Sequence, residues 1–215
     1  MNDYTTDEEL SNKIKQWWVK NGIAVMMSVT LAIGSFGGFT YWSSIKNQKA
    51  ENLSINYSQL LMAFNESRFD DAESLANAII EFDKSSNYAT LSKLLLAKIK
   101  FEGGDTSYAK KLLNQVIVEG EEMGLDTLAR ERLAKILLQE NNTEDARLVL
   151  LNSNIKLSDG SLELLGDIYQ KQGDLTAASE AYKDALTNYQ ETDQDTRNLL
   201  LKINMLENIN TKDNE

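Results

Sequence analysis

The stretch SLELLGDIYQKQGDLTAASEAYKDAL, residues 161–186, has the pattern of two amphipathic helices separated by a turn. Apolar residues recur three or four positions apart on both sides of Gly173-Asp174, so each half would bury one face. Gly166 and Ala178 are small, which would let two antiparallel backbones approach closely where they cross. The apolar positions are Leu162, Leu165, Ile168 and Tyr169 before the turn, and Leu175, Ala178, Ala181, Tyr182 and Ala185 after it.

This hairpin resembles a tetratricopeptide repeat, with Leu162 in place of the usual Trp and Gln190 in place of the usual closing Pro. The resemblance implies that the hairpin stacks against similar hairpins to form a solenoid. The residues that stand at the family's spacing are Leu165, Gly166, Tyr169, Ala178, Tyr182 and Ala185.

Three weaker copies of the pattern precede it, in residues 55–80, 91–117 and 127–151. Alanines 72, 109, 146 and 178 stand at the expected helix crossings, spaced 37, 37 and 32 residues apart, against a usual period of about 34. A polar turn also begins five residues before each alanine. We therefore predict an all-α domain of stacked helical hairpins over residues 46–210. Because the spacing is loose, a non-repetitive helical bundle is the alternative.

The chain's two ends have simpler patterns. Residues 195–209 read as a helix that caps the last repeat, with apolar residues at helical spacing. Residues 211–215 are predicted to be a mobile tail, and the polar residues 1–12 are predicted to be disordered. The apolar residues of the capping helix are Leu199, Leu200, Ile203, Leu206 and Ile209.

A single apolar segment, residues 21–45, contains no charged side chain and includes NGIAVMMSVTLAIGSFGGFTYW at 21–42. A helix over residues 23–42 would rise about 30 Å, the thickness of a hydrocarbon core. Trp17, Trp18, Tyr41 and Trp42 flank it, as aromatic residues do at membrane interfaces. We predict a transmembrane helix. The alternatives are a core helix, which is usually shorter, and a cleaved signal peptide, whose apolar region would be shorter and end in small residues.

The basic residues around this segment predict its orientation. Lys13, Lys15 and Lys20 precede it and Lys46 and Lys49 follow it, which favours a cytoplasmic tail over residues 1–20 and an exported repeat domain. Within the segment, Gly34 and Gly38 form a GxxxG pair, a candidate surface for packing against another membrane helix.

Composition excludes several classes of function. The formal net charge is −11, and because the charges of residues 1–52 cancel, the whole deficit lies in residues 53–215 and argues against nucleic acid as a partner. The chain has no Cys and no His, which excludes a structural zinc site and Ser-His-Asp catalysis. No cofactor or metal motif is present, so we expect a non-enzymatic protein; a hydrolase that uses paired carboxylates is the enzymatic alternative.

The first helix of each hairpin lines the inner groove of a tetratricopeptide solenoid. In the first three copies the groove positions are apolar, so they would form a surface for a segment of another protein. The alternative is that the helix after Lys46 fills this groove. The candidate protein-binding residues are Tyr57, Leu61, Phe64, Leu91, Leu94, Phe101, Leu128 and Leu138.

The whole chain resembles the bacterial YfgM family of ancillary SecYEG translocon subunits. The resemblance lies mainly in the flank IKQWWVKNG at 14–22 and the segment YWSSIKNQKAENLSINYSQLLMAF at 41–64. It implies a single-pass inner-membrane protein with a periplasmic repeat domain, in contact with the lipid bilayer, the SecYEG translocon and a membrane-anchored periplasmic chaperone related to prolyl isomerases. In this family the subunit is thought to help pass exported chains to chaperones. The alternative is a regulator that controls a cytoplasmic stress-response signalling protein through its N-terminal tail.

Overall fold

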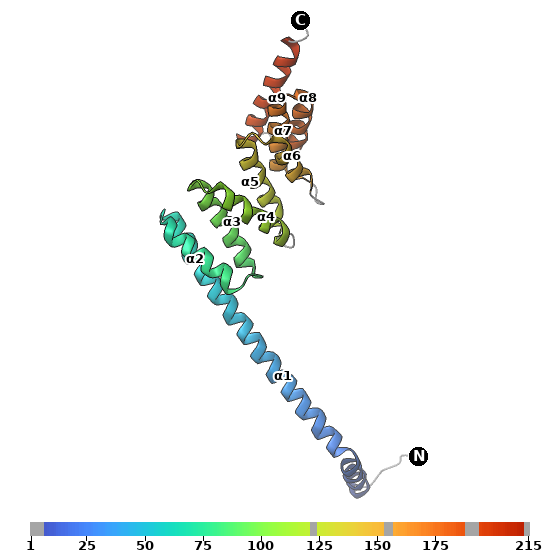
Figure 1. The fold of residues 1–215 in the computed structure, drawn as a ribbon. Helices are drawn as coiled ribbons and strands as arrows, with labels where there is room; N and C mark the ends of the chain where they lie inside the picture. The colour runs from blue at the N-terminus through green and yellow to red at the C-terminus, as the bar shows by residue number, and fades with distance from the viewer. Residues whose placement is uncertain (1–6, 121–123, 153–156, 188–193, 213–215) are drawn as a thin grey trace, which may run out of the picture. The chain divides into compact units, whose positions relative to one another are not determined.

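The computed structural model describes residues 7–120, 124–152, 157–187 and 194–212, and these are all-α, as the sequence predicts (Figure 1). The chain divides into two compact units, Met1–Ser54 and Ile55–Glu215, and the boundary falls within the first helix. The helices are α1 (Asp7–Asn65), α2 (Phe69–Phe82), α3 (Asn87–Glu102), α4 (Thr106–Glu119), α5 (Leu125–Gln139), α6 (Thr143–Leu151), α7 (Asp159–Gln172), α8 (Leu175–Leu186) and α9 (Gln194–Lys212).

The first unit contains most of the helix Glu9–Asn65, which is long and apolar enough to cross a membrane. Nearly all the apolar side chains of its apolar segment are exposed, which fits a span and does not fit the helix of a soluble core. Three of its hydroxyl groups donate to carbonyls within the helix: Ser28 Oγ to Ala24 and Thr30 Oγ1 to Met26, both at 2.8 Å, and Thr40 Oγ1 to Gly37 at 2.9 Å. A helix whose polar groups are paired internally can enter lipid at low cost.

Both chain ends are more ordered than the sequence analysis expects. Helix α1 begins at Asp7, so residues 7–12 are helical. Helix α9 continues to Lys212, so residues 211–212 of the predicted tail are helical as well. Residues 1–6 and 213–215 lie outside the described residues.

The second unit is built from four helical hairpins whose turns share one geometry. Each turn contains one residue with a left-handed backbone followed by the N-cap residue of the next helix. The amide of that N-cap residue donates to the carbonyl five positions earlier, at 2.8–3.0 Å. This hydrogen bond belongs to the Schellman motif that ends a helix. The left-handed residues are Ser67, Gly104, Asn141 and Gly173, one in each turn that the sequence predicts.

The helices that follow three of these turns begin with a side-chain cap. Asp105, Asn142 and Asp174 each accept a hydrogen bond from the amide three residues later. Such caps satisfy amides that the first helical turn leaves without partners. The four crossing alanines are fully buried, at 0% exposure, so the repeat prediction is confirmed by turn geometry and by packing.

Helix α9 closes the far end of the solenoid, as predicted, by packing on α7 and α8. Leu199, Ile203 and Leu206 are buried in one cluster with Tyr182, whereas Leu200 is exposed and the side chain of Ile209 lies outside the described residues. Polar contacts reinforce this packing. Lys202 Nζ, on α9, donates to Asp167 Oδ1 at 2.6 Å and to Glu163 Oε1 at 2.9 Å, and the Tyr182 hydroxyl donates to the same Asp167 oxygen at 2.6 Å.

Tyr182 gives the stability of the repeat domain a dependence on alkaline pH. Burial, followed by the hydrogen bond to Asp167, raises the pKa of Tyr182 above its ordinary value of 10.0. The unfolded chain loses this proton first, so the stabilisation is fully present below about pH 10 and is lost as the pH rises toward the folded pKa. We expect Tyr182→Phe to lower the free energy of unfolding by about 1–2 kcal/mol at neutral pH, because Asp167 then loses one hydrogen-bond donor. Above about pH 10 this variant should lose less stability than the unsubstituted protein. Urea unfolding across this pH range measures both effects, and Tyr108→Phe is the control. Equal pH profiles for Tyr182→Phe and the unsubstituted protein would contradict the assignment.

Candidate functional site

The predicted groove residues all lie on first helices of the hairpins, but they are not equally accessible. Leu61 and Leu128 are exposed, at 38% and 37%. Leu94 is only 4% exposed and packs inside the domain, so its side chain does not line a groove. The adjacent Leu95 is half-buried. A shift of one residue turns a side chain by about 100° around a helix, which accounts for the difference. The half-buried members of the predicted set are Tyr57, Phe64, Leu91, Phe101 and Leu138.

Aromatic contacts join several of these residues. The rings of Tyr57 on α1 and Tyr88 on α3 lie 5.6 Å apart, and Phe64 packs edge-on against Phe69 at 5.9 Å. Lys98 Nζ, on α3, lies 5.0 Å from the centre of the Phe64 ring. Aromatic pairs and cation–π contacts at these separations are attractive. The structure therefore brings the ends of α1 and α3 together along the predicted groove.

A pocket of about 340 Å³ opens between α3 and α5. Ala97, Leu113 and Ile136 are buried and form its apolar floor, and Phe101 stands beside them. Its volume is at the small end of the range for pockets that hold ligands. Lys98, Glu102, Arg132, Lys135 and Gln139 complete the lining. Of the predicted residues, Phe101 alone lines this pocket, while the Leu138 carbonyl accepts a hydrogen bond from Lys171 Nζ at 2.8 Å.

The cations of this pocket are functional candidates that the apolar pattern does not reveal. Arg132 Nη1 donates to the Leu94 carbonyl at 3.1 Å, and burial lowers the pKa of Arg132 below its ordinary value of 12.5. The charge of Arg132 also acts on Tyr57. Burial raises the pKa of Tyr57, and the positive charge of Arg132 opposes that rise. The sequence contains one signal for these cations, since Lys98 and Lys135 are 37 residues apart, the same interval as alanines 109 and 146.

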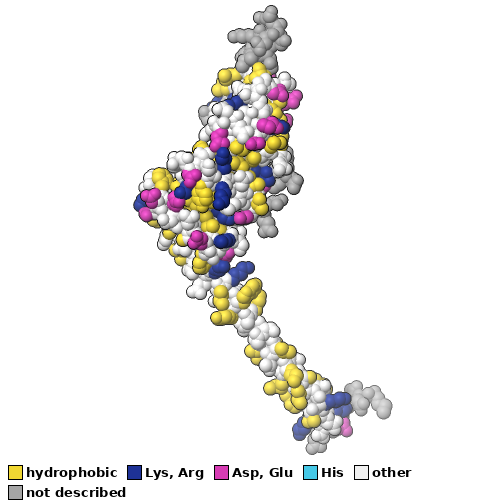
Figure 2. All heavy atoms as spheres, viewed as in Figure 1, with side chains coloured by type: hydrophobic (Ala, Val, Ile, Leu, Met, Phe, Trp, Pro, Cys, Tyr) yellow, Lys and Arg dark blue, Asp and Glu magenta, His cyan; other side chains and the backbone are white. Residues whose placement is uncertain are grey.

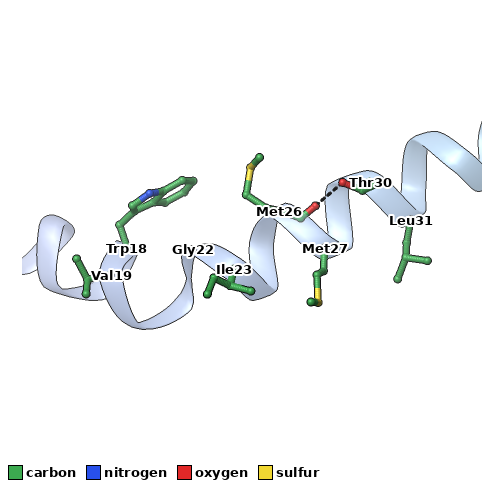
Figure 3. Close-up of a pocket in the computed structure, with 8 residues that line it drawn as sticks. All are labelled: Trp18, Val19, Gly22, Ile23, Met26, Met27, Thr30 and Leu31. Carbon is green, nitrogen blue, oxygen red and sulfur yellow. Dashed lines mark hydrogen bonds between the residues drawn. The ribbon is translucent and has the colours of Figure 1, made fainter.

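A second hollow lies on one face of α1 in the first unit (Figure 3). Trp18 lies over Gly22, where an added Cβ would come within 3.3 Å of Trp18 Nε1. Farther along the helix, an added Cβ at Gly34 or Gly38 would meet nothing within 4 Å. The GxxxG face is therefore open within the described chain, as a helix-packing surface requires.

In residues 9–120, 124–152, 157–187 and 196–207, Asp and Glu side chains form no group of three or more that could hold a metal ion.

Comparison with known proteins places this architecture among repeat proteins. Residues 15–208 match the model of the tetratricopeptide repeat-like domain family. Two solved structures illustrate the shared fold. One comes from a functional characterization of Pseudomonas aeruginosa pilF: it has a TM-score of 0.60 and 16% identity, and the match covers 76% of this chain and 71% of that one. The other is a Podosopora anserina putative kinesin light chain with TPR-like repeats, with a TM-score of 0.57, 13% identity and coverage of 75% and 88%.

Curated relatives match over nearly the full length, and each is named ancillary SecYEG translocon subunit. The protein of Aggregatibacter actinomycetemcomitans is 29% identical over 187 residues, which cover 86% of this chain and 91% of the relative. That of Haemophilus influenzae is 25% identical over 195 residues, covering 89% and 94%. That of Escherichia coli is 24% identical over 186 residues, covering 85% and 88%.

Proposed function

The chain belongs to the tetratricopeptide repeat-like domain family, and from this we propose that it is an ancillary subunit of the SecYEG translocon, a non-enzymatic scaffold that helps pass exported proteins to periplasmic chaperones. The names of the curated relatives confirm the resemblance to the YfgM family. One observation carries the proposal: a helix of membrane-spanning length and a four-hairpin repeat domain occur in one chain, and the relatives match both over nearly their full length.

Anchoring has a direct energetic benefit for such a scaffold. Two partners confined to one membrane meet at a far higher effective concentration than two partners free in solution. Contacts in a repeat groove that are individually weak then suffice for binding. We propose that the apolar residues of the groove, among them Leu61, Phe64 and Leu128, supply these contacts to chains that leave the channel or to a membrane-anchored chaperone.

The direction of the helix in the membrane is part of the proposal. Lys13, Lys15 and Lys20 stand before the apolar segment, and Lys46 and Lys49 after it. This excess favours a cytoplasmic N-terminus and a periplasmic repeat domain. The negative charge of residues 53–215 would keep that domain from adhering to anionic lipid.

Site-specific photo-crosslinking in intact membranes tests the proposal. A photoreactive residue at Leu61 or Leu128 should capture a translocon or chaperone subunit, because both side chains are exposed on the groove side of the first helices. The same probe at Val118, which is 79% exposed on the second helix α4, is the matched control and should capture much less. Equal yields from all three positions, or no translocon or chaperone product from Leu61 and Leu128, would refute a scaffold that works through this groove.

A further inference from the structure

The pocket between α3 and α5 differs in charge from the rest of the domain. The chain carries a net charge of −11, yet the pocket lining contains three cations, Lys98, Arg132 and Lys135, against the single carboxylate of Glu102. Figure 2 shows Lys and Arg side chains gathered beside hydrophobic ones over this part of the repeat domain. The pocket is therefore a basic, partly apolar site in a domain that carries a net negative charge.

Within the described residues these cations have few acidic partners, and the charge of Glu131 acts on Arg132 from beyond ion-pair distance. Lys98 Nζ lies 3.8 Å from Glu102 Oε1 on the same helix. Both groups are exposed, so this ion pair contributes little to stability. Within the described residues, no carboxylate lies within 4.0 Å of Arg132 or Lys135. Arg132 has five N–H donors, and the described chain uses one of them, the bond to the Leu94 carbonyl that fixes its direction. A half-buried guanidinium with spare donors is well prepared to receive a carboxylate through two parallel hydrogen bonds.

The apolar part of the pocket lies next to these donors. Ala97, Leu113 and Ile136 form a buried floor, and Phe101 offers an aromatic edge beside it. A ligand that suits both parts has an acidic group a few ångströms from a large apolar side chain. We propose that this site binds an extended segment of another polypeptide in which aspartate or glutamate neighbours an aromatic or large aliphatic residue.

This inference rests on the proposed function in one respect: it assumes that the repeat domain binds segments of other proteins. It adds which side chains such a segment carries. Long polyanions fit poorly, because the acidic surface around the site would repel them. A short acidic segment avoids that repulsion and places its charge only against Lys98, Arg132 and Lys135. Complementary charge of this kind governs which partner is selected more than how tightly it binds.

Peptide binding to the full chain in nanodiscs of zwitterionic lipid tests the inference. The probe is a fluorescent peptide in which two aspartates flank a phenylalanine, blocked at both ends, and its counterpart carries asparagines instead. We expect the aspartate peptide to bind about tenfold more tightly at low salt, and this preference to shrink as salt is added. Lys98→Glu combined with Lys135→Glu should remove the preference, since both side chains are exposed and reversing their charge does not disturb the core.

The control is Lys111→Glu together with Lys84→Glu, which changes the net charge equally at exposed positions outside the pocket and should preserve the preference. Equal affinity for the two peptides, or equal loss in both double variants, would overturn the inference. Displacement of the aspartate peptide by inorganic phosphate as readily as by unlabelled peptide would also overturn it, since the site would then bind anions in general. Binding of the aspartate peptide only to self-associated protein would instead assign the groove to a second copy of this chain. In each of these cases, crosslinks from Leu61 and Leu128 to translocon or chaperone subunits would leave the proposed function standing.

Discussion

Gly166→Ala should lower the free energy of unfolding of the repeat domain by about 3 kcal/mol, although alanine is normally the better helix residue. A Cβ at Gly166 would lie 2.4, 2.5 and 2.9 Å from three atoms of the Tyr182 ring. The ring cannot move aside easily, because Tyr182 is fully buried between α7 and α9 and its hydroxyl is bound to Asp167. Urea unfolding of the detergent-solubilised chain, followed by circular dichroism, measures the loss.

Gly160→Ala is the matched control on the same helix. A Cβ there would come no closer than 3.4 Å, to Glu131 Oε1, which is an ordinary van der Waals distance. Helix propensity should therefore leave the protein unchanged or up to about 1 kcal/mol more stable. Tyr182→Leu should partly rescue Gly166→Ala, because a smaller side chain frees the space that the new methyl group needs. Equal effects of the two glycine substitutions would contradict close packing at this crossing.

Leu31→Asp combined with Ile33→Asp should release most of the protein from membranes. A carboxylate near the centre of a span costs about 3 kcal/mol to insert, so the pair costs about 6 kcal/mol before the lost apolar residues are counted. Both native side chains are exposed in the structure, so the substitutions disturb no packing within the described chain. Extraction of membranes with alkaline carbonate, followed by sedimentation, measures the fraction retained.

Asn47→Asp combined with Gln48→Asp adds the same charge just outside the apolar segment. This control should stay in the membrane pellet, and because acidic residues contribute little to orientation, it should not invert the helix. Retention of the Leu31→Asp, Ile33→Asp variant in the pellet would mean that the segment does not anchor the chain as proposed.

The repeat architecture could be predicted from the sequence because its signals are local. A left-handed residue followed by a capping residue is visible in Gly104-Asp105 and Gly173-Asp174, and the same geometry occurs at Asn141, a residue that tolerates this backbone well. Ser67 adopts it with a weaker local preference, so that turn depends more on the hairpin around it.

The groove was harder to predict because its details depend on packing. Leu94 and Leu95 are both leucine, and periodicity in an apolar run does not say which of them faces inward. Arg132 counts as polar in any hydropathy pattern, yet it is half-buried, lines the pocket between α3 and α5 and donates to the Leu94 carbonyl. The continuity of α1 through Asn65 could have been expected, since no glycine or proline stands between residues 39 and 102.

Each described helix of the repeat domain packs mainly against the helices beside it in the chain. During synthesis, a hairpin of about 35 residues can therefore form most of its native contacts once it and the preceding hairpin have been made. These contacts do not require parts of the chain that are distant in sequence. The chain also contains no proline, so no slow peptide-bond isomerisation delays that maturation. The repeat domain would thus need little assistance from prolyl isomerases or chaperones to complete its own folding.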